Sequence, residues 1–496
     1  MPKTVGVAVS NATFHFDKLY TYAVMPDQQD TVRLGSMVLV PFGRGSRARM
    51  GVVLACDAEP ESAKLKFLFD VAPASACLTP ELLRLVHFLK ERTFCTYYEA
   101  VKAVIPYGAQ YKPTVAEDGV TPVLQKQLVR HTENAYKLVG TLPPKPRPTA
   151  KQLAAVALLA GGERTLSALE EKGISRAVLD NLCAKGVLEC SKVNKSIDLY
   201  SSIPLKNEPI LLTEEQQAAY DALLPGLEDA APHSALLYGV TGSGKTLVFL
   251  KLIEHCLQMS RRALVLVPEI SLTPQMILRL KSQFGKRVAV QHSALNHTER
   301  LLQWQMIQDG GADIVVGTRS AIFSPLENIG LVIIDEEQEH TYRSESAPRY
   351  SAHEVARQRA AENGALLLLA SATPSTESYY AAQHGRTQQV RLTKRYGGNP
   401  LPKVQIVDMR AELASGNPRE ISLAMEDAIR HNLEAGKQTI LLLNRRGYQT
   451  VAQCEDCREV LKCQKCSVPM VYHKSAHMLL CQDCGIHLDT PFARCH

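Results

Sequence analysis

The sequence has 496 residues, 45% of them apolar, which is enough for about three or four domains with separate hydrophobic cores. Its 56 basic and 50 acidic residues leave a net charge of +6, too small to identify or exclude a nucleic-acid partner. No apolar run approaches the roughly 18 residues of a membrane span, and no secretory signal opens the chain. We therefore expect a soluble, cytoplasmic protein with no membrane partner.

The first hundred residues are predicted to form a small β-rich domain, residues 1–108. Short β-rich runs alternate with turn signals from Val5 to Ala55, and helical periods follow from Thr79 to Ile105. A glycine-bearing loop, residues 44–49, carries three arginines. Their guanidinium groups either meet phosphates or belong to a solvated hairpin tip.

A linker and a winged helix are predicted for residues 109–205. The proline-rich stretch 143–148 indicates an extended connector. Three amphipathic segments and a β-rich run follow it: Lys151–Leu159, Leu166–Lys172, Ser175–Lys185 and Gly186–Cys190. That order predicts a winged helix, with Ser175 capping the third helix. Such a unit either contacts DNA or serves only as a packing module.

Residues 206–398 are predicted to form an α/β domain, because nearly all-apolar β-runs alternate with helices as in a parallel sheet covered on both faces. The expected strands are Ala235–Tyr238, Ala263–Val267, Val288–Val290, Ile314–Val316, Leu331–Ile334 and Leu366–Leu369. The remaining residues, 399–496, are expected to begin a further domain in which Thr439–Leu443 starts another strand.

A Walker A sequence lies between the first of these strands and a helix. It reads Gly239-Val240-Thr241-Gly242-Ser243-Gly244-Lys245-Thr246. The loop of small residues lets backbone N–H groups converge on phosphates, Lys245 adds a positive charge, and the Thr246 hydroxyl can ligate Mg²⁺. A chance glycine turn is the alternative, which the strand, loop and helix order disfavours.

A Walker B sequence follows the strand Leu331–Ile334, where three acids, Asp335, Glu336 and Glu337, end an apolar run. We expect Asp335 to hold Mg²⁺ and Glu336 to orient and deprotonate the attacking water. With Lys245, these two acids are the predicted catalytic residues for nucleoside triphosphate hydrolysis.

Further residues narrow the class of nucleotide hydrolase. Gln216 lies upstream of Walker A, where a glutamine can recognise adenine. The segments 317–321 and 371–374 follow two other strands and carry Arg319 and Thr373. Because the carboxyl ends of parallel strands share one edge of a sheet, these residues are candidates for contact with a nucleic-acid backbone.

With these motifs in order, the chain resembles superfamily 2 helicases and, more closely, the primosomal protein N′ (PriA) family of replication-restart helicases. The stretches that carry the resemblance are Val38–Arg44, Gly239–Thr246, Val267–Gln275, Asp335–Glu337, Leu369–Ser375 and Leu443–Tyr448. It implies a multidomain α/β protein: a β-rich domain that binds a 3′ DNA end, a winged helix, a RecA-like P-loop lobe, and a partial second RecA-like lobe with an inserted zinc-binding region.

The resemblance also implies a function and its partners. It implies an ATP-dependent 3′→5′ DNA helicase that recognises stalled forks and promotes loading of the replicative helicase. The implied ligands are ATP, Mg²⁺ and two Zn²⁺ ions. The implied partners are forked and single-stranded DNA, the single-stranded-DNA-binding protein and other primosome proteins.

The chain departs from the family pattern at three places. Tyr20-Thr21-Tyr22 replaces Phe-Asp-Tyr, so the acid of the family's 3′-OH pocket is missing from this sequence. Gln338 replaces a histidine, yet an amide can still join the γ-phosphate side to the DNA side. The following loop lacks the family's tryptophan, which leaves Arg349 and Tyr350 as the candidate sensors of DNA.

Seven of the thirteen cysteines crowd into the last part of the chain: Cys454, Cys457, Cys463, Cys466, Cys481, Cys484 and Cys495. Thiolate pairs two residues apart can hold zinc, and a reducing compartment disfavours the alternative of disulfides. We expect the inner four cysteines, 463 to 484, to make one complete site. Cys454, Cys457 and Cys495 would belong to a second site whose fourth thiolate is missing.

No arginine-rich segment follows the zinc region, so we expect a chain truncated in its second lobe and lacking that lobe's arginine finger. Such a finger contributes on the order of 10³ to 10⁵ in rate. The alternative function is therefore an ATP- and fork-DNA-binding module without motor activity. The motor subunit of a restriction or remodelling complex is a weaker alternative, which the cysteine pairs disfavour.

Overall fold

The computed structural model describes residues 3–59, 64–128, 132–142, 148–194, 205, 209–268, 274–398, 400, 402–417, 419, 421–442, 460–473, 478–481 and 484–488. The chain divides into two compact units, Met1–Pro400 and Leu401–His496. Within the described ranges, no helix is both long enough and apolar enough to cross a membrane.

The first unit begins with the predicted β-rich domain, an antiparallel sheet in the order β2-β1-β4-β3-β5. Its elements are β1 Thr4–Val9, β2 Tyr20–Ala23, β3 Met37–Phe42, β4 Arg47–Cys56, β5 Asp70–Val71, helices α1 Pro80–Arg92 and α2 Tyr97–Val104, and the hairpin β6 Tyr111–Val115 and β7 Pro122–Lys126. Of the arginine-bearing loop predicted at 44–49, only Arg44 lies in the β3–β4 turn, whereas Arg47 and Arg49 belong to β4. Lys66 donates hydrogen bonds to this turn, to Gly43 O at 2.8 Å and Ser46 Oγ at 3.1 Å.

Three helices follow where the sequence predicts them: α3 Ala150–Leu159, α4 Leu166–Glu170 and α5 Arg176–Ala184. They pack on a sheet of β8 Thr132–Leu138, β9 Arg164–Thr165 and β10 Leu188–Asn194, in the order β10-β8-β9. β8 precedes the helices and was not predicted. Ser175 occupies the N-cap of α5 as predicted, although its side chain makes no capping hydrogen bond.

A seven-stranded parallel sheet in the order β13-β14-β12-β15-β16-β11-β17 forms the centre of the first unit. Its strands are β11 His233–Gly239, β12 Arg262–Leu266, β13 Val288–Gln291, β14 Ile314–Gly317, β15 Ile329–Asp335, β16 Leu366–Ser371 and β17 Gln388–Leu392. Six of them confirm the predicted strands. The edge strand β17 was missed because polar residues at Gln388 and Gln389 break its apolar run.

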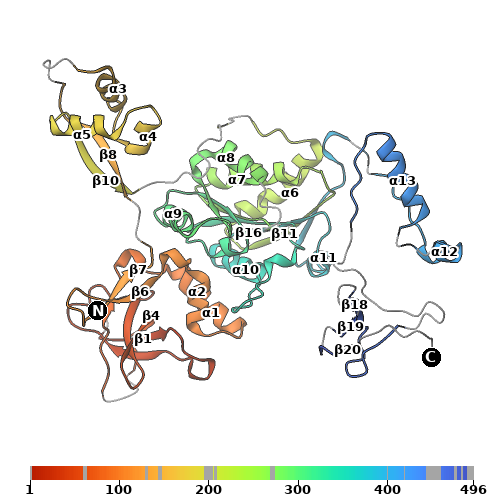
Figure 1. Cartoon of the computed structure of the whole chain (residues 1–496), viewed down its shortest axis with the longest axis horizontal. Helices are drawn as coiled ribbons and strands as arrows, with labels where there is room; N and C mark the ends of the chain where they lie inside the picture. The colour runs from red at the N-terminus through yellow and green to blue at the C-terminus, as the bar shows by residue number, and fades with distance from the viewer. Residues whose placement is uncertain are drawn as a thin grey trace. The chain divides into compact units, whose positions relative to one another are not determined.

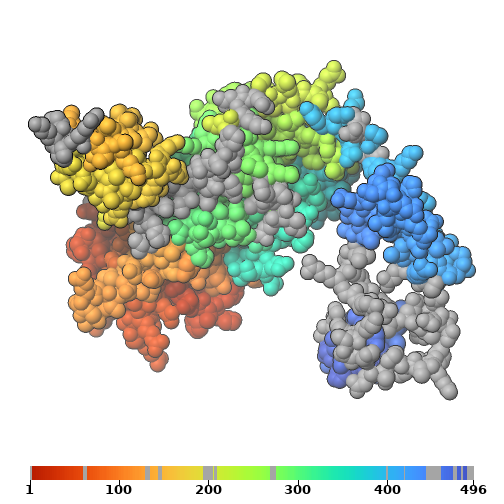
Figure 2. Space-filling model, turned by 45° about the horizontal axis from the view of Figure 1, so that its top comes forward, coloured from red at the N-terminus to blue at the C-terminus, as the bar shows by residue number. Residues whose placement is uncertain are grey.

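Helices cover both faces of this sheet (Figure 1): α6 Glu214–Glu228, α7 Lys245–Gln258, α8 Pro274–Phe284, α9 His297–Gln308, α10 Ala352–Asn363 and α11 Thr376–Gln383. Alternate strand residues face opposite cores. Ile333 packs with α6 and α7, whereas Ile334 packs with α10. The core containing Ile334 also includes Leu82 of α1, so the N-terminal domain and the domain built on the parallel sheet share one hydrophobic core. In Figure 2 their orange and green surfaces lie against each other.

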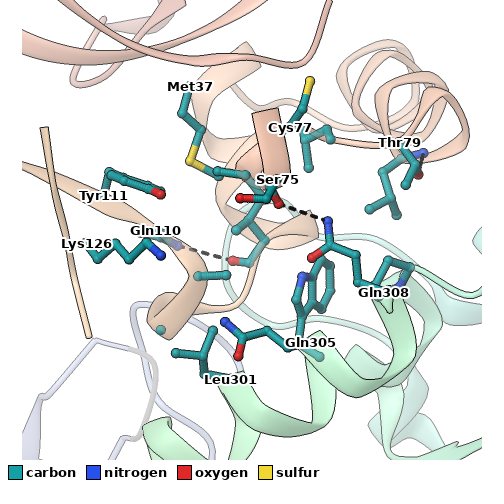
Figure 3. A pocket seen from close by; sticks show the side chains of 18 of the residues that line it. Met37, Ser75, Cys77, Thr79, Gln110, Tyr111, Lys126, Leu301, Gln305 and Gln308 are labelled. Carbon is teal, nitrogen blue, oxygen red and sulfur yellow. Dashed lines mark hydrogen bonds between the residues drawn. The ribbon is translucent and has the colours of Figure 1, made fainter. Parts of the chain in front are cut away.

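A pocket opens between these two domains (Figure 3), where α9 faces the segment 75–79 and the start of the β6–β7 hairpin. Trp304 and Leu301 contribute apolar surface, and Gln305 and Gln308 contribute amides. Gln308 donates a hydrogen bond to Ser75 O at 3.3 Å, which ties α9 to the N-terminal domain beside the pocket.

The second unit contains α12 Met409–Ala414, α13 Leu423–Glu434 and a small antiparallel sheet of β18 Val471–His473, β19 Met478–Leu480 and β20 His487–Leu488. The strand predicted at Thr439–Leu443 is wrong for residues 439–442, which have no β-pairing within the described part of this unit. Ile440 is 94% exposed, because a strand needs a neighbouring strand to bury its apolar side chains. Leu443–Tyr448 lies outside the described residues, as does Glu269–Thr273 in the first unit.

Candidate nucleotide-binding and zinc sites

The Walker A loop joins β11 to α7 through a backbone that only small residues can follow. Gly242 and Gly244 both have φ of +79°, in the left-handed region that favours glycine. A Cβ at Gly239 would lie 2.6 Å from Ser243 Oγ, so that position also requires glycine. Thr241 is exposed on the loop, and Thr246 lies in the first turn of α7.

Two side chains in this loop fit a bound phosphate. Ser243 is 3% exposed, and its Oγ has no hydrogen-bond partner among the described atoms. The Lys245 ammonium donates to Gly239 O at 2.9 Å, which keeps its charge over the loop. A buried hydroxyl without a partner, a nearby ammonium and the N-terminus of α7 together form an anion-binding arrangement.

Gln216 holds the loop from behind. Its Oε1 accepts from Thr213 N at 3.0 Å and its Nε2 donates to Ser243 O at 2.8 Å, while the residue is 1% exposed. A Cβ on Gly244 would clash with this amide. In this conformation both polar atoms of Gln216 are occupied within the protein. Recognition of adenine by Gln216 stays a prediction that requires the amide to exchange partners.

The acidic motif ends β15 on the same edge of the sheet. Burial and the neighbouring Glu336 raise the pKa of Asp335 to about 6, and the positive charge of Lys245 acts in the opposite direction. Tyr342 donates from its hydroxyl to Asp335 O at 2.6 Å and fixes the end of the strand. The electrostatic effect of Lys245 on Asp335 indicates that the Walker A and Walker B residues form one site.

Strand register explains why these distant segments meet. β16 lies between β15 and β11, with Asp335 paired to Ala370 and Tyr238 paired to Ser371. The three strands therefore end level with one another, and their following loops share one rim.

Gln338 links two of those loops. Its Nε2 donates to Glu336 Oε2 at 2.9 Å, and its Oε1 accepts from Ser371 Oγ at 2.5 Å. Ser371 Oγ in turn accepts from Thr373 N at 2.8 Å. A chain of hydrogen bonds thus runs from the candidate base, Glu336, to the exposed loop that carries Thr373.

Glu337 was not predicted to have a structural role, yet it anchors the same rim. It is 2% exposed and accepts bonds from Ser375 N at 2.7 Å, Ser375 Oγ at 3.0 Å and Ser378 Oγ at 2.8 Å. Burial alone would raise the pKa of Glu337, but the His353 ring 3.6 Å away and the hydrogen bonds from the two serines hold that pKa below its usual range. The only sequence signal was Ser375 as a helix N-cap, which gives no partner 38 residues away.

The predicted DNA-contacting residues divide into two sets. Arg319 donates to Thr341 O at 3.2 Å and Arg343 O at 2.5 Å, and its guanidinium carbon lies 5.9 Å from the centre of the Tyr350 ring. Tyr350 is only 7% exposed and packs against Phe323. Arg349 and Thr373 are exposed. Arg319 and Tyr350 therefore shape the rim, while Arg349 and Thr373 face outward from it; DNA contact by any of the four stays a prediction.

The second unit brings four cysteines together. The sulfur atoms of Cys463, Cys466, Cys481 and Cys484 all lie within 4.8 Å of one another. Tetrahedral Zn–S bonds of ~2.3 Å require sulfurs ~3.8 Å apart, and Cys463 and Cys484 are separated by 3.6 Å. Backbone N–H groups of Cys466 and Lys465 lower the pKa of Cys463 to about 7, which favours the thiolate that zinc requires. Cys454, Cys457 and Cys495 lie outside the described residues.

Comparisons with known proteins agree with this organisation. Residues 5–106 match the 3′DNA-binding domain (3′BD) of PriA, residues 213–381 match DEAD/DEAH box helicases, and residues 463–488 match the Cys-rich region of PriA DNA helicases. The replication restart protein PriA of Bacillus subtilis is 35% identical over 97% of this chain and 67% of its own length. PriA of Chlamydia muridarum is 30% identical over 97% of this chain and 64% of its own. The chain thus spans about two thirds of the length of these relatives.

Proposed function

Because this chain belongs to the PriA family of replication restart proteins, we propose that it is an ATP-dependent DNA helicase that moves 3′→5′ at stalled replication forks. Its role would be to reopen the fork for loading of the replicative helicase, together with single-stranded-DNA-binding protein and other primosome proteins. We assign residues 1–108 to a DNA-end-binding domain, 109–205 to a linker and winged helix, 206–398 to helicase lobe 1, and 399–496 to the start of lobe 2.

The observation that carries the proposal is the hydrogen-bonded chain from Glu336 through Gln338 and Ser371 to Thr373 N. Lys245 would contact the β- and γ-phosphates, and Thr246 and Asp335 would hold the Mg²⁺ that neutralises them. Glu336 would accept the proton of the attacking water. Loss of the γ-phosphate would then change the hydrogen bonds of Gln338 and, through Ser371, the position of the loop at Thr373. A motor requires such a coupling between hydrolysis and its DNA contacts.

A second candidate is an ATP- and fork-DNA-binding module that does not translocate. The described residues of the second unit form two helices and a small antiparallel sheet rather than a second parallel sheet, which favours this alternative. A single lobe can bind nucleotide but cannot cycle against a partner lobe.

The two candidates differ in strand separation. ATP hydrolysis should be measured with and without forked DNA, beside release of a labelled strand, for this chain and for a version extended to the length of its relatives. We expect Glu336→Gln to retain Mg·ATP binding and lose hydrolysis in both. Strand release by the extended chain alone supports the second candidate for these 496 residues. Hydrolysis by the Gln variant at the parental rate would assign the base to another residue.

A further inference from the structure

Three phenylalanines stand out from the surface of the N-terminal domain, and we call them the aromatic patch. Phe14 is 54% exposed, Phe16 is 68% exposed, and Phe94 is 96% exposed. The first two lie in the short 3₁₀ helix Phe14–Phe16 between β1 and β2, and the third lies in the turn between α1 and α2. Large apolar side chains exposed together on a surface are typical of a contact with a partner.

The backbone beneath the patch is fixed by buried polar groups. The Asp17 carboxylate, with a side chain 4% exposed, accepts the N–H of Tyr97 through both oxygens at 3.1 Å and pairs with Lys90 at 2.6 Å. The Tyr20 hydroxyl donates to Phe16 O at 2.7 Å. The segment that carries Phe14 and Phe16 is therefore held against α1 and α2, with its rings directed outward.

The Lys90 ammonium contacts both the Phe14 ring and the turn that carries Phe94. Lys90 Nζ lies 4.9 Å from the centre of the Phe14 ring and donates to Cys95 O at 3.0 Å, next to Phe94. His15, Lys18 and Arg92, which are close in sequence to these phenylalanines, are exposed, as is the acidic residue Glu91. Aromatic and basic residues therefore alternate along the two segments that carry the patch.

That alternation suits single-stranded nucleic acid better than a protein or a duplex. Unpaired bases stack on aromatic faces, whereas the bases of a duplex are already stacked, and the phosphates between them pair with Lys, Arg and His. We propose that the aromatic patch binds single-stranded DNA by base stacking, next to the Tyr20-Thr21-Tyr22 segment and separate from it. The proposal rests on the DNA binding proposed above, and it assigns a site for nucleotides other than the terminal one.

Leucine variants isolate the stacking contribution. Phe14→Leu, Phe16→Leu and Phe94→Leu, together in the full chain, keep apolar bulk and all charges but remove the aromatic faces. Val120→Ala, which trims an 80%-exposed apolar side chain in the β6–β7 turn, is the matched control. Binding of a 5′-labelled 15-nucleotide oligo-dT and of a blunt duplex of equal length should be followed by fluorescence anisotropy across a salt series.

We expect the triple variant to bind oligo-dT about tenfold more weakly or worse, since each stacked base contributes about 1–3 kcal/mol. Its dependence of affinity on salt should be unchanged, because phenylalanines release no counterions, and its binding to the duplex should match the parent. A variant with Trp in place of Phe at the three positions should bind oligo-dT with about the parental affinity. Parental affinity for oligo-dT in the Leu variant, or an equal loss on the duplex, would refute the patch while leaving the helicase proposal intact. Failure of the parent to bind oligo-dT would refute both.

Discussion

Arg359 of α10, with no exposed surface, donates hydrogen bonds to both carboxylate oxygens of Glu81 on α1, at 2.8 and 3.0 Å. Its other N–H groups bond to the carbonyls of Ile322, Ser324 and Leu326, just beyond the loop that carries Arg319. One guanidinium therefore fastens the N-terminal domain to the nucleotide-binding domain and holds the loop after β14 at the same point. The two domains belong to one compact unit, and this pair is a buried polar contact between them.

Glu81→Ala should lower the free energy of unfolding of the first unit by about 3–5 kcal/mol, because it leaves the Arg359 charge buried without its counterion. Arg84→Ala provides the control, because Arg84 is 55% exposed and its pair with Glu362 contributes about 0–1 kcal/mol, while Gln358 still donates to Glu362 in the variant. Chemical denaturation of the two variants measures the difference. Equal effects would mean that the Arg359–Glu81 pair does not fasten the domains.

Lys245→Ala should abolish productive ATP binding without unfolding the chain, since it removes the ammonium from the phosphate-binding loop and leaves the backbone bonds of Gln216 and Thr213 in place. Titration with a fluorescent ATP analogue, beside a thermal melt, provides the measurement. An unchanged nucleotide affinity would contradict the assignment of the loop.

Asp335→Asn should stabilise the metal-free protein at pH 7.5. The folded-state pKa of about 6 lies above the ordinary 3.8, so ionised Asp335 destabilises the fold, by about 3 kcal/mol once the pH is well above 6. Between about pH 4 and pH 6 the parental carboxyl is protonated in the folded chain but ionised in the unfolded chain. The advantage of Asn should therefore shrink as pH falls from about 7 to about 4. Melts in EDTA across this range check it, and a difference independent of pH would argue against the assigned cause.

Ser371→Ala should leave ATP binding intact and impair the stimulation of ATP hydrolysis by DNA. The substitution removes the hydroxyl that donates to Gln338 and accepts from Thr373 N, while Lys245 and Asp335 keep their positions. We expect ATP affinity within about twofold of the parent and a clear loss of DNA-stimulated hydrolysis, on the order of tenfold. Ser346→Ala, in the exposed loop, is the control. Full DNA stimulation in Ser371→Ala would remove Ser371 from the coupling path.

The purified chain should hold one tightly bound zinc, in the cluster of Cys463, Cys466, Cys481 and Cys484. Cys466→Ser should release it and loosen the sheet β18–β20, whose small core includes two of these cysteines. Cys190→Ser, at an exposed free cysteine on β10, should retain it. Elemental analysis decides the matter: two tightly held ions, or none, would refute the predicted pairing of the cysteines.

Features that depend on neighbours in sequence were predictable, and features that depend on strand order were not. The glycines around Lys245 and the acids after Ile334 are contiguous, so their chemistry follows from local spacing. Gln338 and Ser371 are 33 residues apart, and they meet because β15 and β16 are adjacent in the sheet. Arg359 and Glu81 are 278 residues apart, and nothing in either helix indicates its partner. Buried polar pairing between domains leaves no periodic pattern to recognise.

Glu336 has a φ of +46°, a left-handed backbone that a residue with a Cβ adopts at a penalty of roughly 1–2 kcal/mol. Glycine would relax that position, just as asparagine would relax the buried charge at Asp335. Substitutions at two neighbouring positions are thus expected to raise thermal stability, and a selection for stability alone would favour them. Directed evolution of this chain for thermal stability should therefore discard its candidate base and metal ligand early, unless ATP turnover is selected at the same time.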